Sequence, residues 1–181
     1  MKMAKKFLAI ALAGVLALSV LTGCGDSANT KSIAEAMSDM VKAEDITVKE
    51  KPELNTKAKK FVEVLAEPVA LAVDVTAEPD EGLDSQETFM DIMDIMGPSY
   101  SNQFVWVSAT KTKGYNATAQ ASNLLYNMLQ MNPSVDEDEG NWADTWYIGT
   151  ATLTQDGTTY RFAVITAEAQ TPADGGNTGE Q

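Results

Sequence analysis

The sequence predicts an α+β domain in which about four helices cover a small, mainly antiparallel sheet, giving an α-β-α sandwich. Three observations predict it: three helical patterns come first, a β-rich segment follows, and a fourth helix leads into a hairpin. Antiparallel pairing of that hairpin with the earlier strand would build the sheet, and the helices would bury their apolar faces on it. About 135 residues are available for this domain, enough for one hydrophobic core.

Two amphipathic patterns predict the first two helices. Ser32 and Glu35 have the spacing of a capping box, so we expect the first helix to begin at Ser32 and to end near residues 42–44. The second helix is expected over residues 52–66, because a Glu-Pro pair follows and would end it. The segment ITVKEKPEL, which lies between the two patterns, is interpreted as a connection.

Cap and breaker residues define two further helices. The third helix should be capped by Asp84 or Ser85 and should end at Gly97-Pro98. Asn116 should cap a fourth helix that runs to about Met131. The helical spacing of its apolar residues predicts a buried face made of Ala121, Leu124, Leu125, Met128 and Leu129.

Three β-rich segments predict the sheet. QFVWVSATK is expected to form a strand over residues 103–110, and TWYIGTATLT and TTYRFAVITAE are expected to form two more. The last two segments are joined by Gln155-Asp156-Gly157, and the Asp-Gly pair favours a tight hairpin turn. Residues 69–84 are expected to form a loop or a short extended piece, and residues 169–181 a disordered tail.

The N-terminal segment has the pattern of a signal peptide that ends at a cysteine. Three lysines precede an apolar stretch over residues 7–21, which is short for a membrane span. Leu21-Thr22-Gly23-Cys24 follows, and Cys24 is the only cysteine of the chain. This tetrapeptide resembles the lipobox of bacterial lipoproteins. An ordinary signal peptide with an incidental cysteine is the alternative.

The lipobox resemblance implies cleavage before Cys24 and acylation of its thiol. Residues 1–23 would then be a lipoprotein signal peptide, and residues 24–31 a lipidated cysteine with a flexible linker to a domain over residues 32–168. The implied location is the outer face of the bacterial cytoplasmic membrane, or the outer membrane if the source has one. The lipid bilayer, reached through acylated Cys24, is the first expected partner.

Charge and composition exclude several classes of function. Removal of residues 1–23 would leave 10 basic and 26 acidic residues, a formal net charge of −16. Nucleic acid is therefore not an expected partner, and the acidity should keep the domain soluble and away from anionic surfaces. The chain has no histidine, which removes the usual serine, cysteine and zinc machineries. A lysine or carboxylate mechanism remains open.

Several segments together resemble the bacterial branch of the CAP superfamily (cysteine-rich secretory, antigen 5, pathogenesis-related 1; SCP-like domains). MVKAEDITVKEKPELNTKAKKFVEVLA resembles its first two helices, and PDEG its PDG turn. GYNATAQASNLLYNML resembles the helix that follows the family's GEN strand, and WYIGTATLTQDGTTYRFAVITAE its closing hairpin. The likeness covers about residues 33–168. It implies the family's fold around a central cleft, in which complete members place two histidines and two acids, often as a divalent-metal site.

The motifs of that cleft are degenerate in this chain. Thr76 stands near the first histidine position, and Ser101, Asn102 and Gln103 replace the GEN motif, so its acid is missing. NPSVDEDEG replaces the expected GHR motif. We therefore expect no metal site of the family type, no cofactor and no enzymatic activity from this cleft.

Two other features are candidates for binding. Asp136 and Asp138 lie in an acidic loop that could collect a calcium ion, although a solvated loop is the favoured interpretation because the ligands do not alternate. Trp142 follows this loop, and we expect it to be exposed and available to a glycan or peptide.

The sequence thus predicts a lipid-anchored, non-catalytic binding or scaffold domain. Its partner would be an unidentified envelope polymer, a protein or a small apolar ligand. The alternative is a carboxylate-dependent envelope hydrolase that acts on glycans. Two carboxylates that face each other about 5 to 9 Å apart across a cleft would favour this alternative.

Overall fold

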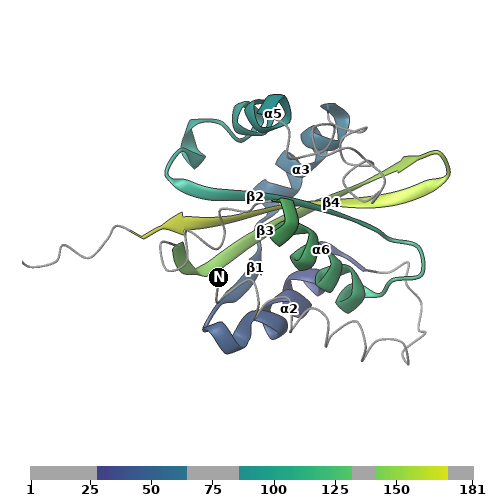
Figure 1. Ribbon diagram of the computed structural model, residues 1–181, viewed down its shortest axis with the longest axis horizontal. Coiled ribbons are helices and arrows are strands. Elements are labelled where there is room, and N and C mark those ends of the chain that lie inside the picture. Colours follow the sequence, from purple (N-terminus) through teal and green to yellow (C-terminus); the bar gives the residue numbers. More distant parts are fainter. Residues whose placement is uncertain (1–27, 65–85, 132–141, 171–181) are drawn as a thin grey trace, which may run out of the picture.

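The computed structural model describes residues 28–64, 86–131 and 142–170. In this part of the chain a four-stranded sheet lies between two layers of helices, as the α+β, α-β-α prediction requires (Figure 1). The described elements in chain order are α2 (Thr30–Val41), the 3₁₀ turn η2 (Lys42–Glu44), β1 (Thr47–Glu50), α3 (Pro52–Val64), α5 (Gln86–Met96), the 3₁₀ turn η4 (Pro98–Tyr100), β2 (Gln103–Lys111), α6 (Ala117–Met131), β3 (Trp142–Gln155) and β4 (Thr158–Ala169).

The sheet is mixed, with the strand order β1-β3-β4-β2. β4 pairs antiparallel with both β2 and β3, as predicted, whereas β1 pairs parallel with β3. β1 lies in the segment ITVKEKPEL, which was wrongly expected to be only a connection. This strand has four residues, of which Val48 alone is buried, so its sequence carries too little alternation to predict a strand.

The helix α2 begins two residues earlier than the capping-box prediction placed it. Asn29, not Ser32, is the N-cap residue: its Oδ1 accepts a hydrogen bond from the Ser32 backbone amide at 2.9 Å. The Ser32 hydroxyl in turn accepts from the Asn29 amide at 3.0 Å, so the reciprocal box is Asn29 with Ser32. The predicted box of Ser32 with Glu35 was wrong.

Two apolar cores lie on opposite faces of the sheet. α2 and α6 cover one face, and α3 and α5 cover the other (Figure 1). The predicted buried face of α6 is confirmed, because Ala121, Leu124, Leu125, Met128 and Leu129 are all buried. The Asn116 cap of this helix is also confirmed, since its Oδ1 accepts from the Ala119 amide at 2.9 Å.

The predicted hairpin is present and its turn explains the Asp-Gly pair. Gln155 and Thr158 are register partners, so Asp156 and Gly157 alone form the loop. Their φ angles are 50° and 75°, the left-handed conformations that a type I′ turn needs at both central positions. Among the described residues, no helix is long and apolar enough to cross a membrane.

Candidate binding pocket

A surface pocket of about 610 Å³ lies where β2 begins and β4 ends. Gln103 of β2 pairs with Glu168 of β4 in the sheet. Next to this pair, the Ala169 amide donates a hydrogen bond to the Asn102 carbonyl at 3.3 Å. The residues that line the pocket are Ser101, Asn102, Gln103, Phe104, Ala169 and Gln170. The sheet therefore brings the end of β4 against Ser101, Asn102 and Gln103.

An aromatic cluster, composed of Phe104, Trp106, Trp142 and Trp146, adjoins the pocket. Phe104 belongs to both, and its ring stacks on Trp106 with centroids 5.7 Å apart and planes inclined by 16°. The ring of Trp142 packs edge-on against both of these rings, with its centroid 5.8 Å from that of Phe104 and 5.4 Å from that of Trp106. Trp146 continues the cluster into the core at 5.1 Å from Trp106. These contacts hold Phe104 as a rigid apolar wall of the pocket.

Trp142 is buried. Its place after the acidic loop had predicted that it would be exposed, and this prediction was wrong. Only 4% of its surface is accessible, because β4 extends to Ala169, the register partner of Trp142, and the indole packs into the aromatic cluster. Its contact with Phe104 nevertheless places it behind the pocket wall. Trp142 can support the binding surface but does not form it.

The structure groups three of the residues expected from the sequence and leaves others undescribed. Ser101, Asn102 and Gln103 line one pocket. Cys24, Thr76, Asp136 and Asp138 lie outside the described residues. The sequence pattern does not show that Phe104, Ala169 and Gln170 line the pocket, because Phe104 has the pattern of a strand residue and the other two lie in the segment expected to form a disordered tail.

The described lining of the pocket is polar but carries no ionisable side chain. Three amides and one hydroxyl supply both hydrogen-bond donors and acceptors, beside the ring of Phe104. No pair of facing carboxylates occurs in this lining. Within residues 28–64, 86–131 and 142–170, no group of three His, Cys, Asp or Glu side chains could hold a metal ion. The pocket is chemically suited to a neutral ligand that has polar groups and an apolar face.

A second cluster lies around the buried phenol of Tyr100. Lys51 places its ammonium 5.2 Å from the centre of the Tyr100 ring and 5.5 Å from that of Tyr147, and it lies 3.9 Å from the Glu53 carboxylate. Desolvation, followed by the negative charge of Glu53, raises the pKa of Tyr100 to about 12. The phenol is therefore neutral under physiological conditions and packs as a core residue.

This raised pKa predicts a loss of stability in alkali. The folded state favours the neutral phenol. The contribution of Tyr100 to the free energy of unfolding is therefore fully present below about pH 10, the pKa of an unfolded tyrosine. That contribution should be lost as the pH rises toward the folded pKa of about 12. Absorbance titration should show a tyrosine step near pH 12 that disappears in Tyr100→Phe but persists in Tyr126→Phe, which removes an exposed tyrosine. An unchanged titration in Tyr100→Phe would contradict this assignment.

Comparison of the chain with protein-family models, with curated proteins and with solved structures found no match.

Proposed function

We propose that this protein is a membrane-anchored extracytoplasmic lipoprotein whose CAP-like domain binds a neutral segment of an envelope polymer without catalysis. The observation that carries the binding function is the pocket, in which amides, a hydroxyl and a fixed aromatic ring form one neutral surface. Sugar rings offer the matching chemistry, because hydroxyl and acetamido groups exchange hydrogen bonds with amides while the apolar face of the ring packs on an aromatic side chain.

The uncharged described lining of the pocket supports a binding role over the hydrolase alternative, because a glycosidase of the usual kind needs two carboxylates on either side of the scissile bond. The layered α-β-α arrangement is compatible with the CAP resemblance, which we retain as part of the proposal. The membrane anchor rests on the sequence pattern that ends at Cys24.

The tryptophans provide a direct assay of binding at the pocket. The chain contains three tryptophans, and all three belong to the aromatic cluster behind Phe104. Titration with soluble N-acetylglucosamine oligomers or with wall glycan fragments should therefore change the intrinsic fluorescence in a saturable manner.

The double variant Asn102→Ala/Gln103→Ala should weaken this binding about tenfold or more, since each lost hydrogen bond contributes about 1 kcal/mol. Thr152→Ala, an exposed substitution on β3, serves as the control and should bind like the parent chain. If the fluorescence titration of the double variant has the same midpoint as that of the parent chain, the pocket is excluded as the binding site. No response to any wall fragment would exclude the proposed ligand class.

A further inference from the structure

Arg161 joins three parts of the domain in the half of the sheet that lies toward the β3–β4 turn. Its guanidinium donates hydrogen bonds to Gln120 Oε1 of α6 at 2.8 Å, to Thr150 Oγ1 of β3 at 3.0 Å and to the Ala28 carbonyl at 2.7 Å. All three acceptors are neutral, and burial lowers the pKa of Arg161. A guanidinium still remains charged near neutral pH, so these oxygens replace the water that the charge has lost.

The same end of the domain holds the next residues of the chain. Thr30 Oγ1 lies 2.8 Å from Thr150 Oγ1 and donates to Asn55 Oδ1 at 3.1 Å, while Asn29 caps α2. Arg161 binds the carbonyl immediately before this cap. From Ala28 onward, the chain is therefore attached to both layers of the domain and cannot act as a flexible linker.

This attachment leaves a very short tether to the proposed anchor. Ala28 is the fourth residue after Cys24. Four extended residues span at most about 14 Å, which is less than the width of the domain. If Cys24 is acylated, the part of the sheet around Arg161 must therefore stay close to the bilayer surface.

The loop between β2 and α6 lies at this same end. Lys111 is the register partner of Tyr160, the neighbour of Arg161, and Gln120 Nε2 donates to the Tyr115 carbonyl at 2.9 Å. The loop exposes Lys111 and Lys113, and Tyr115 is 40% exposed. Although the whole chain is acidic, lysines beside an exposed tyrosine suit the interface between anionic headgroups and water.

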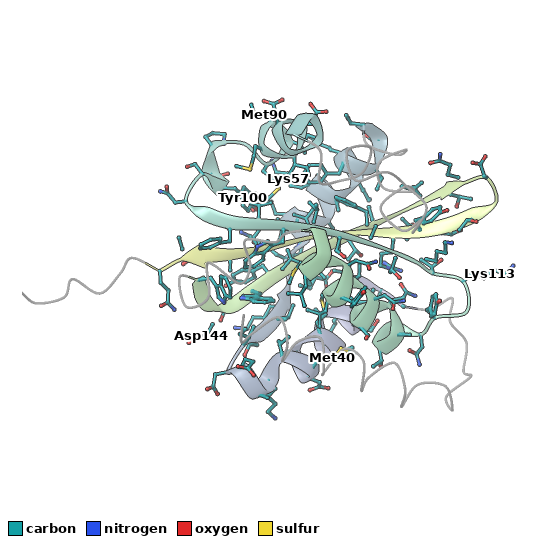
Figure 2. The ribbon with its side chains drawn as sticks, in the orientation of Figure 1. Met40, Lys57, Met90, Tyr100, Lys113 and Asp144 are labelled. Carbon is teal, nitrogen blue, oxygen red and sulfur yellow. The ribbon has the colours of Figure 1, made fainter. Side chains whose placement is uncertain are left out.

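The pocket lies at the other end of the sheet. Glu168, which pairs with Gln103 at the pocket, follows Arg161 by seven residues along β4, a distance of about 24 Å for an extended strand. Figure 2 shows Lys113 and Asp144 toward opposite ends of the molecule's longest axis. β2 begins and β4 ends on the side of Asp144 (Figures 1 and 2).

We propose that the anchored domain stands end-on to the bilayer, with the Lys111–Asn116 loop facing the headgroups and the pocket facing away from the membrane. This inference rests on the proposed lipid anchor and adds the orientation of the binding site. The short tether limits the distance between the domain and the bilayer. Because Arg161 holds Ala28, the part of the sheet around Arg161 is the part that lies near the membrane. The pocket would thereby be presented to a polymer that lies outside the membrane.

Depth-dependent quenching in vesicles tests this orientation. Acylation would consume the only cysteine thiol of the natural chain, so Lys113→Cys and Asp144→Cys would each carry a single reactive thiol for a fluorophore. Both positions are exposed. The full acylated protein would be reconstituted into vesicles of equal parts phosphatidylglycerol and phosphatidylcholine, with a nitroxide on the headgroup of a minor lipid. The label at position 113 should be quenched several-fold more than the label at position 144.

Each outcome has a separate meaning. Equal quenching of the two labels, or stronger quenching at position 144, in protein that floats with the vesicles would overturn the orientation while leaving the anchor intact. Protein that does not float with the vesicles would overturn the anchor, and the orientation with it.

A tether variant provides the matched control. A flexible Gly-Ser insert of about ten residues between Asp26 and Ser27 adds a reach comparable to the size of the domain without changing any described contact. In this variant the quenching difference between the two labels should fall at least several-fold. A difference that is unchanged by the insert would contradict the role of the short tether.

Discussion

Replacement of Gly149 by alanine is expected to lower the free energy of unfolding by about 3 kcal/mol or more. Gly149 lies on the face of β3 that carries α3, and a Cβ atom at this position would overlap the backbone of Leu54 and Asn55. Backbone cannot rotate away as a flexible side chain can, so α3 would have to shift as a unit. The close packing of this helix on the strand thus depends on the missing side chain.

A shift of α3 would also disturb the polar contacts that Asn55 makes. Its Oδ1 accepts from the Thr150 amide at 2.8 Å and from the Thr30 hydroxyl at 3.1 Å, which links α3 to β3 and to the start of α2. Urea unfolding of the soluble domain would measure the loss. Thr152→Ala, an exposed change on the same strand, should alter stability by less than about 0.5 kcal/mol. Equal stability of the Gly149→Ala and Thr152→Ala variants would show that α3 does not pack as described.

Cys24→Ala is expected to abolish stable membrane attachment. Without a thiol the chain cannot receive the diacylglyceryl group, and two acyl chains, at about 0.8 kcal/mol per buried methylene, are what would hold the domain on the bilayer. The variant should appear either as uncleaved precursor or as released protein, with the membrane-bound mature form reduced at least tenfold.

Fractionation of cells that express the full chain would measure this effect. Ser27→Ala, which changes a residue outside the lipobox, should leave both processing and membrane retention unchanged. Normal cleavage and membrane retention of the Cys24→Ala protein would contradict the lipid anchor.

The elements predicted well from the sequence are those with a strong local signal. α6 has both an Asn116 cap and a full apolar stripe, and the hairpin has an Asp-Gly turn between two β-rich segments. β1 was missed because its stability comes from a parallel partner almost a hundred residues away, as Thr47 pairs with Thr145. A four-residue segment cannot reveal such a nonlocal pairing through its own pattern.

The pocket could be predicted only in part. Ser101, Asn102 and Gln103 line the pocket, whereas the CAP resemblance implies a cleft that also includes Thr76, which lies outside the described residues. Ala169 and Gln170 were assigned to the tail because the composition changes after Glu168, yet β4 continues to Ala169. Trp142 was expected to be exposed because an acidic loop precedes it. Its burial depends on rings contributed by β2, which sequence proximity to a loop cannot show.

Mass spectrometry of the N-terminal peptide, isolated from the membrane fraction of cells that express the natural chain, tests the anchored lipoprotein most directly. We expect a peptide that begins at Cys24 and carries a diacylglyceryl group on its sulfur. We also expect residues 1–23 to be absent from the mature protein. A mature protein that retains residues before Cys24, or one that begins elsewhere with an unmodified Cys24 thiol, would contradict the lipid anchor.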